Sequence, residues 1–250
     1  MPRSGKLSQS RRRGYNKRTD APSGPAEDAL IIFAKAPLPG QVKTRLCPPL
    51  TPDEAASLHG SMVMDVAEHT RDIRNLDRFL ACTPSSEHGF FQTLAARYGV
   101  VLCEQVGNDL GQRMHNALAE VLSKGYRYAL VIGTDIPTLS PKTYKDALFL
   151  LNKHDVVIGP THDGGYYLIG LKQPSPQLFQ EVPWSTETVC ALTQSKAATL
   201  GLTVGQLPTE RDLDTFSDLH GIMTETPRRK MSTRTTTVLQ TLLQRHGQLS

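Results

Sequence analysis

The sequence predicts an α/β fold in which helices cover a mostly parallel central sheet. The first observation is a set of short apolar runs without polar alternation, which is typical of strands buried on both faces. The second is that segments with helical periodicity separate these runs. The third is the length of 250 residues, which fits one domain of roughly 200 residues plus tails.

The net charge of the chain lies at its N-terminus. The formal charge is +4, and residues 1–28 hold seven basic and three acidic residues, so the rest of the chain holds 21 of each. This first segment has almost nothing to bury, and we expect a disordered basic arm over residues 1–28. It is more typical of a solvated or weakly anion-binding segment than of a specific nucleic-acid reader.

Composition also bears on location. The chain has no apolar run of about 20 residues that predicts a transmembrane helix, and its N-terminus lacks the apolar segment of a secretory signal. The four cysteines form no CxxC pair and no zinc spacing, so we interpret them as reduced thiols. We therefore expect a cytoplasmic protein without a membrane partner, although the Arg-rich start leaves an organelle transit peptide open.

Residues 29–34 predict the first buried strand, and the loop after it is unusual. Residues 35–46 contain Gly40 and three cations, Lys35, Lys43 and Arg45. A strand–loop–helix unit with glycine and cations is where α/β proteins bind phosphates. The cations would repel one another without an anion, while the alternative is an exposed, solvated loop. The loop matches neither the Walker A pattern nor GxGxxG.

Helix signals and apolar runs then alternate. Thr51, Pro52 and Glu54 form the N-cap, first position and capping-box partner of a predicted helix. The elements predicted up to residue 102 are a helix over 52–72, a strand over 78–82, a helix over 87–98 and a strand over 100–102.

The next helix is predicted to begin after Asp109, a good N-cap. Arg113 falls in its first turn, where the helix dipole disfavours a cation unless a phosphate or carboxylate offsets the cost. A plain surface arginine explains this position equally well.

The apolar run 129–133 predicts a central parallel strand. Asp135 follows at its carboxyl end, where open α/β sheets bind their ligands. The competing interpretation is that Asp135 caps the next helix. Ser140 and Pro141 already supply an N-cap and a first position, so a functional role is favoured.

A helix over 141–152 and a strand over 155–160 lead into the turn Asp163-Gly164-Gly165. A hairpin into a strand over 167–169 would explain the two glycines. The Asp163 carboxylate and the backbone N–H groups of the turn could also cradle a substrate. The residues favour neither interpretation over the other.

The last part of the domain contains a helix capped by Ser185 or Thr186, a strand over 203–207 and an acidic segment around Asp214. Those acids could cap a helix or give a metal a second carboxylate. We expect one folded domain over 29–222 and a basic C-terminal tail over 223–250, with a final helix near 235–246.

Six segments together resemble a known family: FAKAPLPGQVKTRL, LGQRM, VIGTDIPTL, DVVIGPTHDGGYYLIGL, VPWST and DLDTFSDL. In this order they resemble the bacterial radical-SAM/selenodomain-associated transferases, a glycosyltransferase-like group with a nucleotide-diphospho-sugar transferase (GT-A) fold. More distantly they are similar to 2-phospho-lactate guanylyltransferase and to molybdenum-cofactor nucleotidyltransferases. The resemblance implies a three-layer α/β/α domain and spans nearly all of it.

The resemblance also implies roles for individual residues. Asp135 and Asp214 match the carboxylates that hold Mg²⁺ or Mn²⁺, and Gln112 stands where an acid is expected, which puts a charge-dependent role there in doubt. The catalytic set implied is Asp135, Lys43 and Arg45. The nucleotide-binding set predicted from the loop and the resemblance is Lys35, Gly40, Lys43, Thr44, Arg45 and Arg113. The acceptor side implied is Asp163, Gly164, Gly165 and Tyr166.

We therefore expect a metal-dependent transferase with a nucleotide-sugar donor and a small-molecule acceptor. The alternative is a nucleotidyltransferase that condenses a nucleoside triphosphate with a small phosphorylated or acidic metabolite and releases pyrophosphate. An alternative of another class is a non-catalytic nucleotide-binding module.

Overall fold

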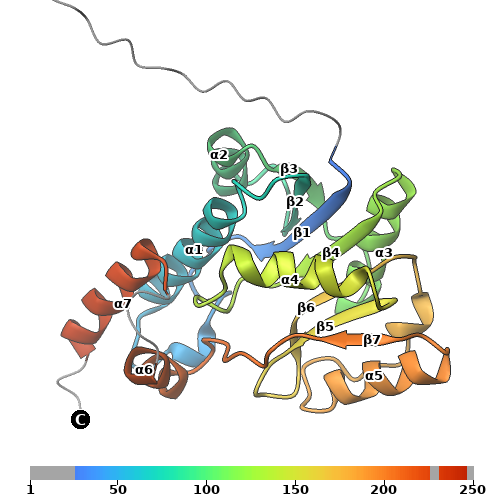
Figure 1. Cartoon of the computed structure of the whole chain (residues 1–250). Helices are drawn as coiled ribbons and strands as arrows, with labels where there is room; N and C mark the ends of the chain where they lie inside the picture. The colour runs from blue at the N-terminus through green and yellow to red at the C-terminus, as the bar shows by residue number, and fades with distance from the viewer. Residues whose placement is uncertain (1–25, 226–230, 247–250) are drawn as a thin grey trace, which may run out of the picture.

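A computed structural model describes residues 26–225 and 231–246 of the chain. One sheet runs through it in the order β3-β2-β1-β4-β6-β5-β7 (Figure 1). β6 is antiparallel to β4 and β5, and the other pairs are parallel, which confirms the mostly parallel sheet. The strands are β1 (Asp28–Lys35), β2 (Leu76–Thr83), β3 (Val101–Glu104), β4 (Tyr128–Ile132), β5 (Val156–Pro160), β6 (Tyr166–Leu171) and β7 (Val204–Gln206).

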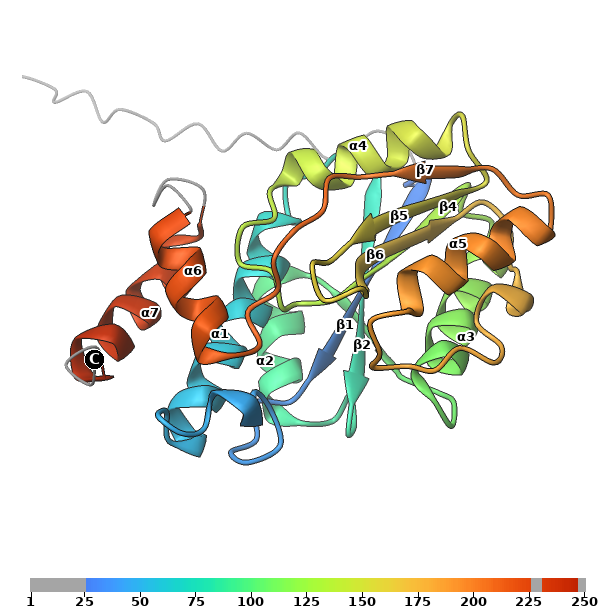
Figure 2. The same cartoon turned by 90° about the horizontal axis from the view of Figure 1, so that it is seen from below.

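Helices cover both faces of the sheet and complete the three layers (Figures 1 and 2). The apolar cluster on one face includes residues of α1, α2 and α4, and the cluster on the other includes residues of α3 and α5. The helices are α1 (Pro52–His69), α2 (Gly89–Tyr98), α3 (Leu110–Ser123), α4 (Pro141–Leu151), α5 (Val189–Thr199), α6 (Phe216–Glu225) and α7 (Thr233–His246).

The central strands show why their sequences lack polar alternation. Successive side chains of a strand point to opposite faces of its sheet. In β1, Leu30 and Ile32 enter the cluster under α1 and α4, whereas Ala29 and Ile31 enter the cluster under α3 and α5. Both faces of β1 are therefore buried, and every position of the run has to be apolar.

Two predicted helix starts have different outcomes. The capping box of α1 is confirmed: Thr51 N donates to Glu54 Oε2 at 2.9 Å, and Glu54 N donates to Thr51 Oγ1 at 3.2 Å. The prediction that Ser185 or Thr186 caps α5 is wrong, because α5 begins at Val189. Ser185 has a left-handed φ of 67°, and the Thr186 hydroxyl bonds to the Pro183 carbonyl instead.

The end of the described chain forms a third, smaller core with α1. Buried side chains of α1, α6 and α7 pack there with Leu46, Leu50 and Leu213. The boundary expected at residue 222 falls inside α6, and α7 covers the final helix expected near 235–246. The predicted arm up to residue 25, and residues 226–230 and 247–250 of the predicted tail, lie outside the described residues. The disorder expected as far as residue 28 is wrong at Asp28, which is the buried first residue of β1.

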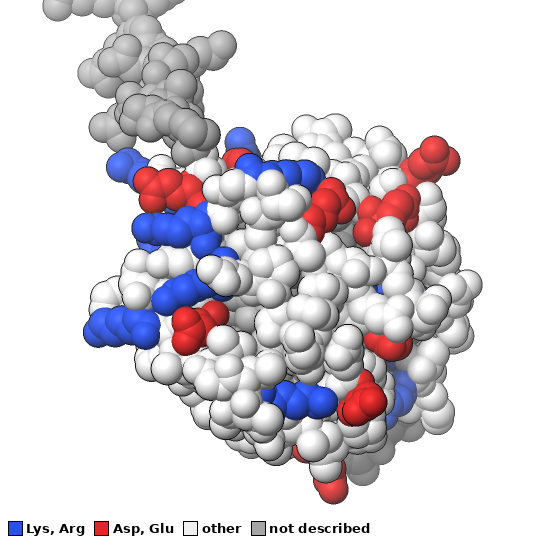
Figure 3. Space-filling model, turned by 90° about the vertical axis from the view of Figure 1, so that its right-hand side faces the viewer, with Lys and Arg blue, Asp and Glu red and all other residues white. Residues whose placement is uncertain are grey.

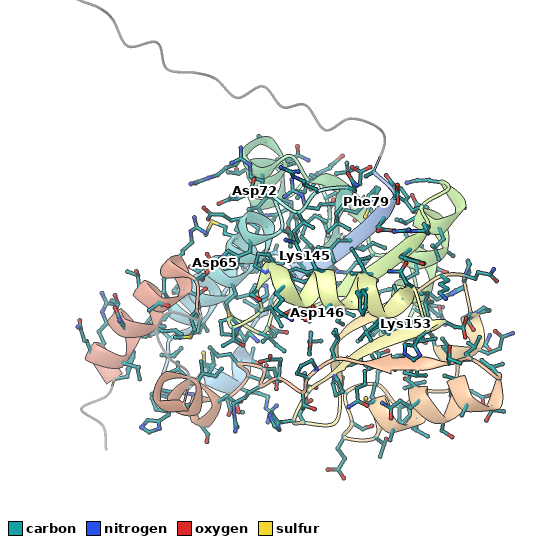
Figure 4. The ribbon with its side chains drawn as sticks, viewed as in Figure 1. Asp65, Asp72, Phe79, Lys145, Asp146 and Lys153 are labelled. Carbon is teal, nitrogen blue, oxygen red and sulfur yellow. The ribbon has the colours of Figure 1, made fainter. Side chains whose placement is uncertain are left out.

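Asp65 fastens α7 to α1 (Figure 4). Its Oδ2 accepts the Thr235 N–H at 3.0 Å and the hydroxyls of Ser232 and Thr235. Its Oδ1 receives Arg234 Nη1 at 2.7 Å. Asp65 is 6 % exposed, so this single carboxylate satisfies the first turn of α7 from inside the protein.

The surface carries charges of both signs. On the face shown in Figure 3, the basic and acidic side chains are interspersed. No described helix has the length and apolar character needed to cross a membrane.

We predict that Asp65→Ala lowers the free energy of unfolding by about 3 kcal/mol, because it removes one partner of a buried ion pair and several hydrogen bonds. Urea unfolding measures the effect. Asp72→Ala, which truncates an exposed aspartate shortly after α1 (Figure 4), is the control and should stay within about 0.5 kcal/mol of wild type. Equal effects of the two changes would contradict the anchoring role of Asp65.

We predict a second, pH-dependent effect at the other end of α7. The hydrogen bond from Thr51 N lowers the pKa of Glu54 from 4.5 to about 2, and the contact with His246 adds to this against the raising effect of burial. A lowered pKa in the folded state gives stability above the unfolded value that is lost as the pH falls. Wild type should therefore lose stability between pH 4.5 and 2 more steeply than Glu54→Gln. Unfolding in urea across that range tests this, and parallel curves would exclude it.

Candidate active site

The candidate site lies where the direction of chain progression across the sheet reverses. From β1 the chain runs outward through β2 and β3, and then returns to place β4 on the other side of β1. The carboxyl ends of the adjacent parallel strands β1 and β4 are the place where open α/β sheets bind ligands. The loop after β1 follows the carboxyl end of that strand (Figure 2), and Asp135 follows the end of the adjacent β4.

Four charged side chains from three segments meet there. Lys43 Nζ lies 2.5 Å from Asp135 Oδ1 and 3.5 Å from Asp214 Oδ1. Arg45 Nη1 lies 2.9 Å from Asp214 Oδ2. The structure therefore brings together the four residues for which the sequence predicted catalytic or metal-binding roles.

Backbone contacts hold the two acidic segments together. The N–H of Leu213 donates to the carbonyl of Asp135 at 2.8 Å, which places Asp214 beside the end of β4. Leu213 also packs with Leu46 in the third core. Because Leu46 follows Lys43 and Arg45 closely in the chain, the same apolar cluster holds both sides of the ion-pair network.

Lys43 is held in an unusual conformation. Its φ of 50° and ψ of 35° are left-handed, which is uncommon for a residue other than glycine. Its side chain is 3 % exposed, whereas that of Asp135 is 49 % exposed. The ammonium is thus buried beneath carboxylates that are open to solvent.

The electrostatics keep Asp135 ionised. Desolvation by the surrounding protein raises the pKa of this carboxyl, but the charge and hydrogen bond of Lys43 outweigh it, and the pKa is lowered overall. Smaller contributions come from His59 and Lys35. A carboxylate that stays charged is what a cation site requires.

His59 of α1 is a neighbour of this site that the sequence interpretation missed. Its Nε2 lies 3.1 Å from the Lys35 carbonyl, so Nε2 carries the proton, and burial lowers the pKa of the ring. Its Nδ1 is buried without a hydrogen-bond partner among the described residues. The available signal was the position of His59 on the buried side of α1, four residues before the buried Val63.

The other predicted donor residues surround the network less directly. Lys35 is the exposed last residue of β1, and its charge acts on Asp135. Gly40 has a left-handed φ of 75° in the exposed part of the loop. Thr44 is exposed at the start of the short 3-10 turn Thr44–Leu46.

Arg113 lies at the start of α3 and is not joined to this network by a contact within the described chain. It donates its Nε–H to the Gly107 carbonyl at 3.0 Å. The neighbouring Gln112, which stands where an acid was expected, forms hydrogen bonds at the start of α3. Its side chain accepts the N–H of Asn108 and donates to Asp109, whose side chain caps the helix.

The Asp-Gly-Gly turn has a clear structural role. β5 and β6 form the antiparallel pair on either side of it, and Asp163 Oδ1 accepts the Gly165 N–H at 3.0 Å. Gly164 has a φ of 86°, and a Cβ there would lie 1.9 Å from the Glu187 carbonyl oxygen. The hairpin interpretation is thus confirmed, while an acceptor role for Asp163, Gly164 and Gly165 stays a prediction.

Tyr166, the fourth predicted acceptor residue, packs edge-on against Trp184 with ring centroids 6.4 Å apart. Trp184 in turn covers Gly111, where a Cβ would lie 2.4 Å from the indole ring. The LGQRM and VPWST segments therefore meet on the face of the sheet that α3 and α5 cover. An acceptor role for Tyr166 also stays a prediction.

Four acidic residues, Asp163, Asp212, Asp214 and Asp218, interact electrostatically between the Asp-Gly-Gly turn and the candidate site, and we call them the acidic rim. Burial raises the pKa of Asp212, and with the charges of Asp163, Asp214 and Asp218 it reaches about 6. Asp163 is thus close enough to act electrostatically on the segment that carries Asp214.

The residues at the centre fit a divalent cation. Within the described ranges, no three His, Cys, Asp or Glu side chains converge as a closed metal site requires. Mg²⁺, however, is usually held by one or two carboxylates together with substrate phosphates. Asp135 and Asp214 both direct an oxygen at one cationic group, the Lys43 ammonium, so their arrangement suits an ion of this class.

Comparison with known proteins agrees with this architecture. Residues 66–186 match the profile of DUF2064, a family described as uncharacterized proteins conserved in bacteria. This match covers 121 of the 250 residues, just under half of the chain. The chain also resembles a solved structure from Desulfovibrio desulfuricans G20, provisionally described as a nucleotide-diphospho-sugar transferase. The TM-score is 0.79 at 31% identity, over 86% of this chain and 94% of that one.

A curated relative of this chain is 2-phospho-L-lactate guanylyltransferase from Methanothermobacter thermautotrophicus. It is 28% identical over 124 residues, which are 49% of this chain and 53% of the relative, so the match spans about half of its length. CMP:2-keto-3-deoxy-manno-octonic acid synthetase, solved with CTP, shares the fold with a TM-score of 0.50 at 13% identity, over 80% of this chain and 98% of that one. The GT-A type of fold is confirmed, while the radical-SAM association stays a prediction.

We predict that Gly164→Ala destabilises this protein more than Gly125→Ala does. Both glycines have a left-handed φ, but a Cβ at Gly125 would meet nothing within 4 Å, whereas one at Gly164 would collide with the Glu187 backbone. The backbone conformation alone costs about 1–2 kcal/mol, and the collision should add roughly 1–3 kcal/mol. Chemical unfolding of the two variants measures the difference, and equal losses would show that the turn is free to shift.

Proposed function

We propose that this protein is a nucleotidyltransferase that uses a nucleoside triphosphate and a divalent cation, Mg²⁺ or Mn²⁺. The observation that carries the proposal is the meeting of Lys43, Arg45, Asp135 and Asp214 at the carboxyl ends of β1 and β4. At this edge the two basic side chains can bind phosphates, and the two carboxylates can bind a divalent cation.

In the proposed reaction, an oxygen nucleophile of the acceptor attacks the α-phosphorus of the triphosphate. A bond forms between this oxygen and the α-phosphorus. The bond between the α-phosphorus and the oxygen that bridges it to the β-phosphorus breaks, and pyrophosphate leaves with that electron pair. Lys43 and Arg45 bind the phosphate oxygens on which negative charge develops. Asp135 and Asp214 would hold the divalent cation, which when bound neutralises charge on the phosphates.

The relatives support this class of reaction. One curated relative is a guanylyltransferase, although only about half of it is matched.

A second candidate is glycosyl transfer from a sugar nucleotide. The similarity to the Desulfovibrio desulfuricans G20 structure, provisionally described as a nucleotide-diphospho-sugar transferase, favours it. The same cations would then bind the diphosphate, and the leaving group would be a nucleoside diphosphate. A non-catalytic nucleotide-binding module is the remaining alternative. The meeting of Lys43, Arg45, Asp135 and Asp214 at the carboxyl ends of β1 and β4 argues against it.

The test begins with finding the donor. Thermal unfolding is recorded with each of the four nucleoside triphosphates and with a set of sugar nucleotides, in the presence and absence of Mg²⁺ or Mn²⁺. A ligand at about 100 times its dissociation constant adds about 2.7 kcal/mol, which raises the midpoint by roughly 5–11 °C for a domain of this size. A metal-dependent shift with one triphosphate supports nucleotidyl transfer, a shift with a sugar nucleotide supports the second candidate, and nucleotide binding that needs no divalent cation favours the non-catalytic module.

We predict that Asp135→Asn lowers turnover by on the order of 100- to 1000-fold, because it removes a charge that the transition state needs. Pyrophosphate release from the identified donor is the assay, and circular dichroism checks the fold. Asp146→Asn is the control, because this half-exposed aspartate of α4 pairs only with Lys142 among the described residues (Figure 4). Wild-type turnover in Asp135→Asn would remove Asp135 from the mechanism.

A further inference from the structure

The two carboxylates of the candidate site share one buried ammonium. Lys43 Nζ lies 2.5 Å from Asp135 Oδ1 and 3.5 Å from Asp214 Oδ1, while Arg45 occupies the other oxygen of Asp214. Two positive and two negative charges form a closed set. Both cations that would bind phosphate are therefore committed to the carboxylates that would bind the metal.

This pairing opposes either ligand when it arrives alone. A divalent cation would meet the Lys43 ammonium between its two carboxylates and would be repelled by Arg45 as well. A polyphosphate would need the two cations while the carboxylates beside them repel it. When both arrive, the carboxylates can exchange the ammonium for the metal, and Lys43 and Arg45 can exchange carboxylates for phosphates.

We propose that Lys43 fills the divalent-cation position of the ligand-free protein and that nucleotide phosphates withdraw it, so that metal and nucleotide bind together. This inference rests on the proposed function for its nucleotide half. Its metal half concerns only the side chains Lys43, Asp135 and Asp214.

The environment of Lys43 suits an exchange of this kind. Its side chain is 3 % exposed, whereas those of Asp135 and Asp214 are 49 % and 37 % exposed, so the ammonium lies inside the protein while solvent reaches the two carboxylate side chains. The loop that carries Lys43 contains Gly40, which is exposed, with no heavy atom within 4 Å of a Cβ placed there. An incoming phosphate can therefore approach the loop without displacing packed side chains at that position.

The metal half is tested by binding of Mn²⁺ alone to the full-length protein, measured by electron paramagnetic resonance as the loss of the free Mn²⁺ signal. Because Lys43→Met vacates the position between the carboxylates, it should bind Mn²⁺ at least about 10-fold more tightly than wild type, within the usual range of coupling between sites. Lys43→Gln serves as a second variant if the methionine variant does not fold. Adding Asp135→Asn to either variant should abolish the gain.

Lys35→Met is the control for charge. Lys35 acts electrostatically on Asp135 but lies exposed at the end of β1, outside the ion-pair network. If occupancy by Lys43 is the cause, Lys35→Met should change Mn²⁺ affinity much less than Lys43→Met. An equal gain in the two variants, or no gain in Lys43→Met and Lys43→Gln, would overturn the proposal.

The nucleotide half is tested by calorimetric titration of the donor triphosphate with and without Mn²⁺. Coupling is reciprocal, so in wild type each ligand should tighten the other, and in Lys43→Met this mutual effect should shrink. If no nucleotide binds but Lys43→Met gains Mn²⁺, the exchange at the carboxylates stands and the proposed function fails. If wild type binds nucleotide with Mn²⁺ but neither Lys43 variant gains Mn²⁺ affinity, the function stands and the exchange fails.

Discussion

The ammonium of Lys43 is the point at which three parts of the chain depend on one another. It reaches Asp135 after β4 and Asp214 before α6 from the loop after β1. A buried cation is tolerated only when it is paired, so this loop and both acidic segments have to keep their positions for the lysine to stay charged and buried. The left-handed backbone at Lys43 shows that local conformational preference gives way to this requirement.

The third apolar core packs against both sides of the ion-pair network. Leu46 and Leu213 pack in one cluster with α1, α6 and α7, and each lies within a few residues of a member of the ion-pair network. α7 closes the cluster through Asp65 near the end of α1 and through Glu54 at its start. α7 is therefore connected through apolar packing to the loop after β1, although it lies far from this loop in the sequence.

The site also shows how one fold can serve related transfers. In the proposed function, the cations and carboxylates at the ends of β1 and β4 act on the phosphate part of a donor, which is common to sugar nucleotides and nucleoside triphosphates. The predicted acceptor side is the β5–β6 turn, in which the Gly165 N–H donates to Asp163 Oδ1. The choice between the two transfers therefore rests on which donor bond the bound acceptor faces.

The sequence by itself determined most of the secondary structure and the central residues of the site. Buried strands need apolar side chains on both faces, and capping boxes use local hydrogen bonds, so both leave a local pattern. Asp135 and the cations of residues 35–46 could be predicted from the sequence for the same reason, because each of these segments follows a recognisable strand. Only the tertiary structure decided that Leu213 bonds to Asp135, that His59 lies beside the site, and that Asp65 anchors α7. These contacts join residues distant in the chain, and their side chains serve equally well in many local settings, so no short-range pattern marks them.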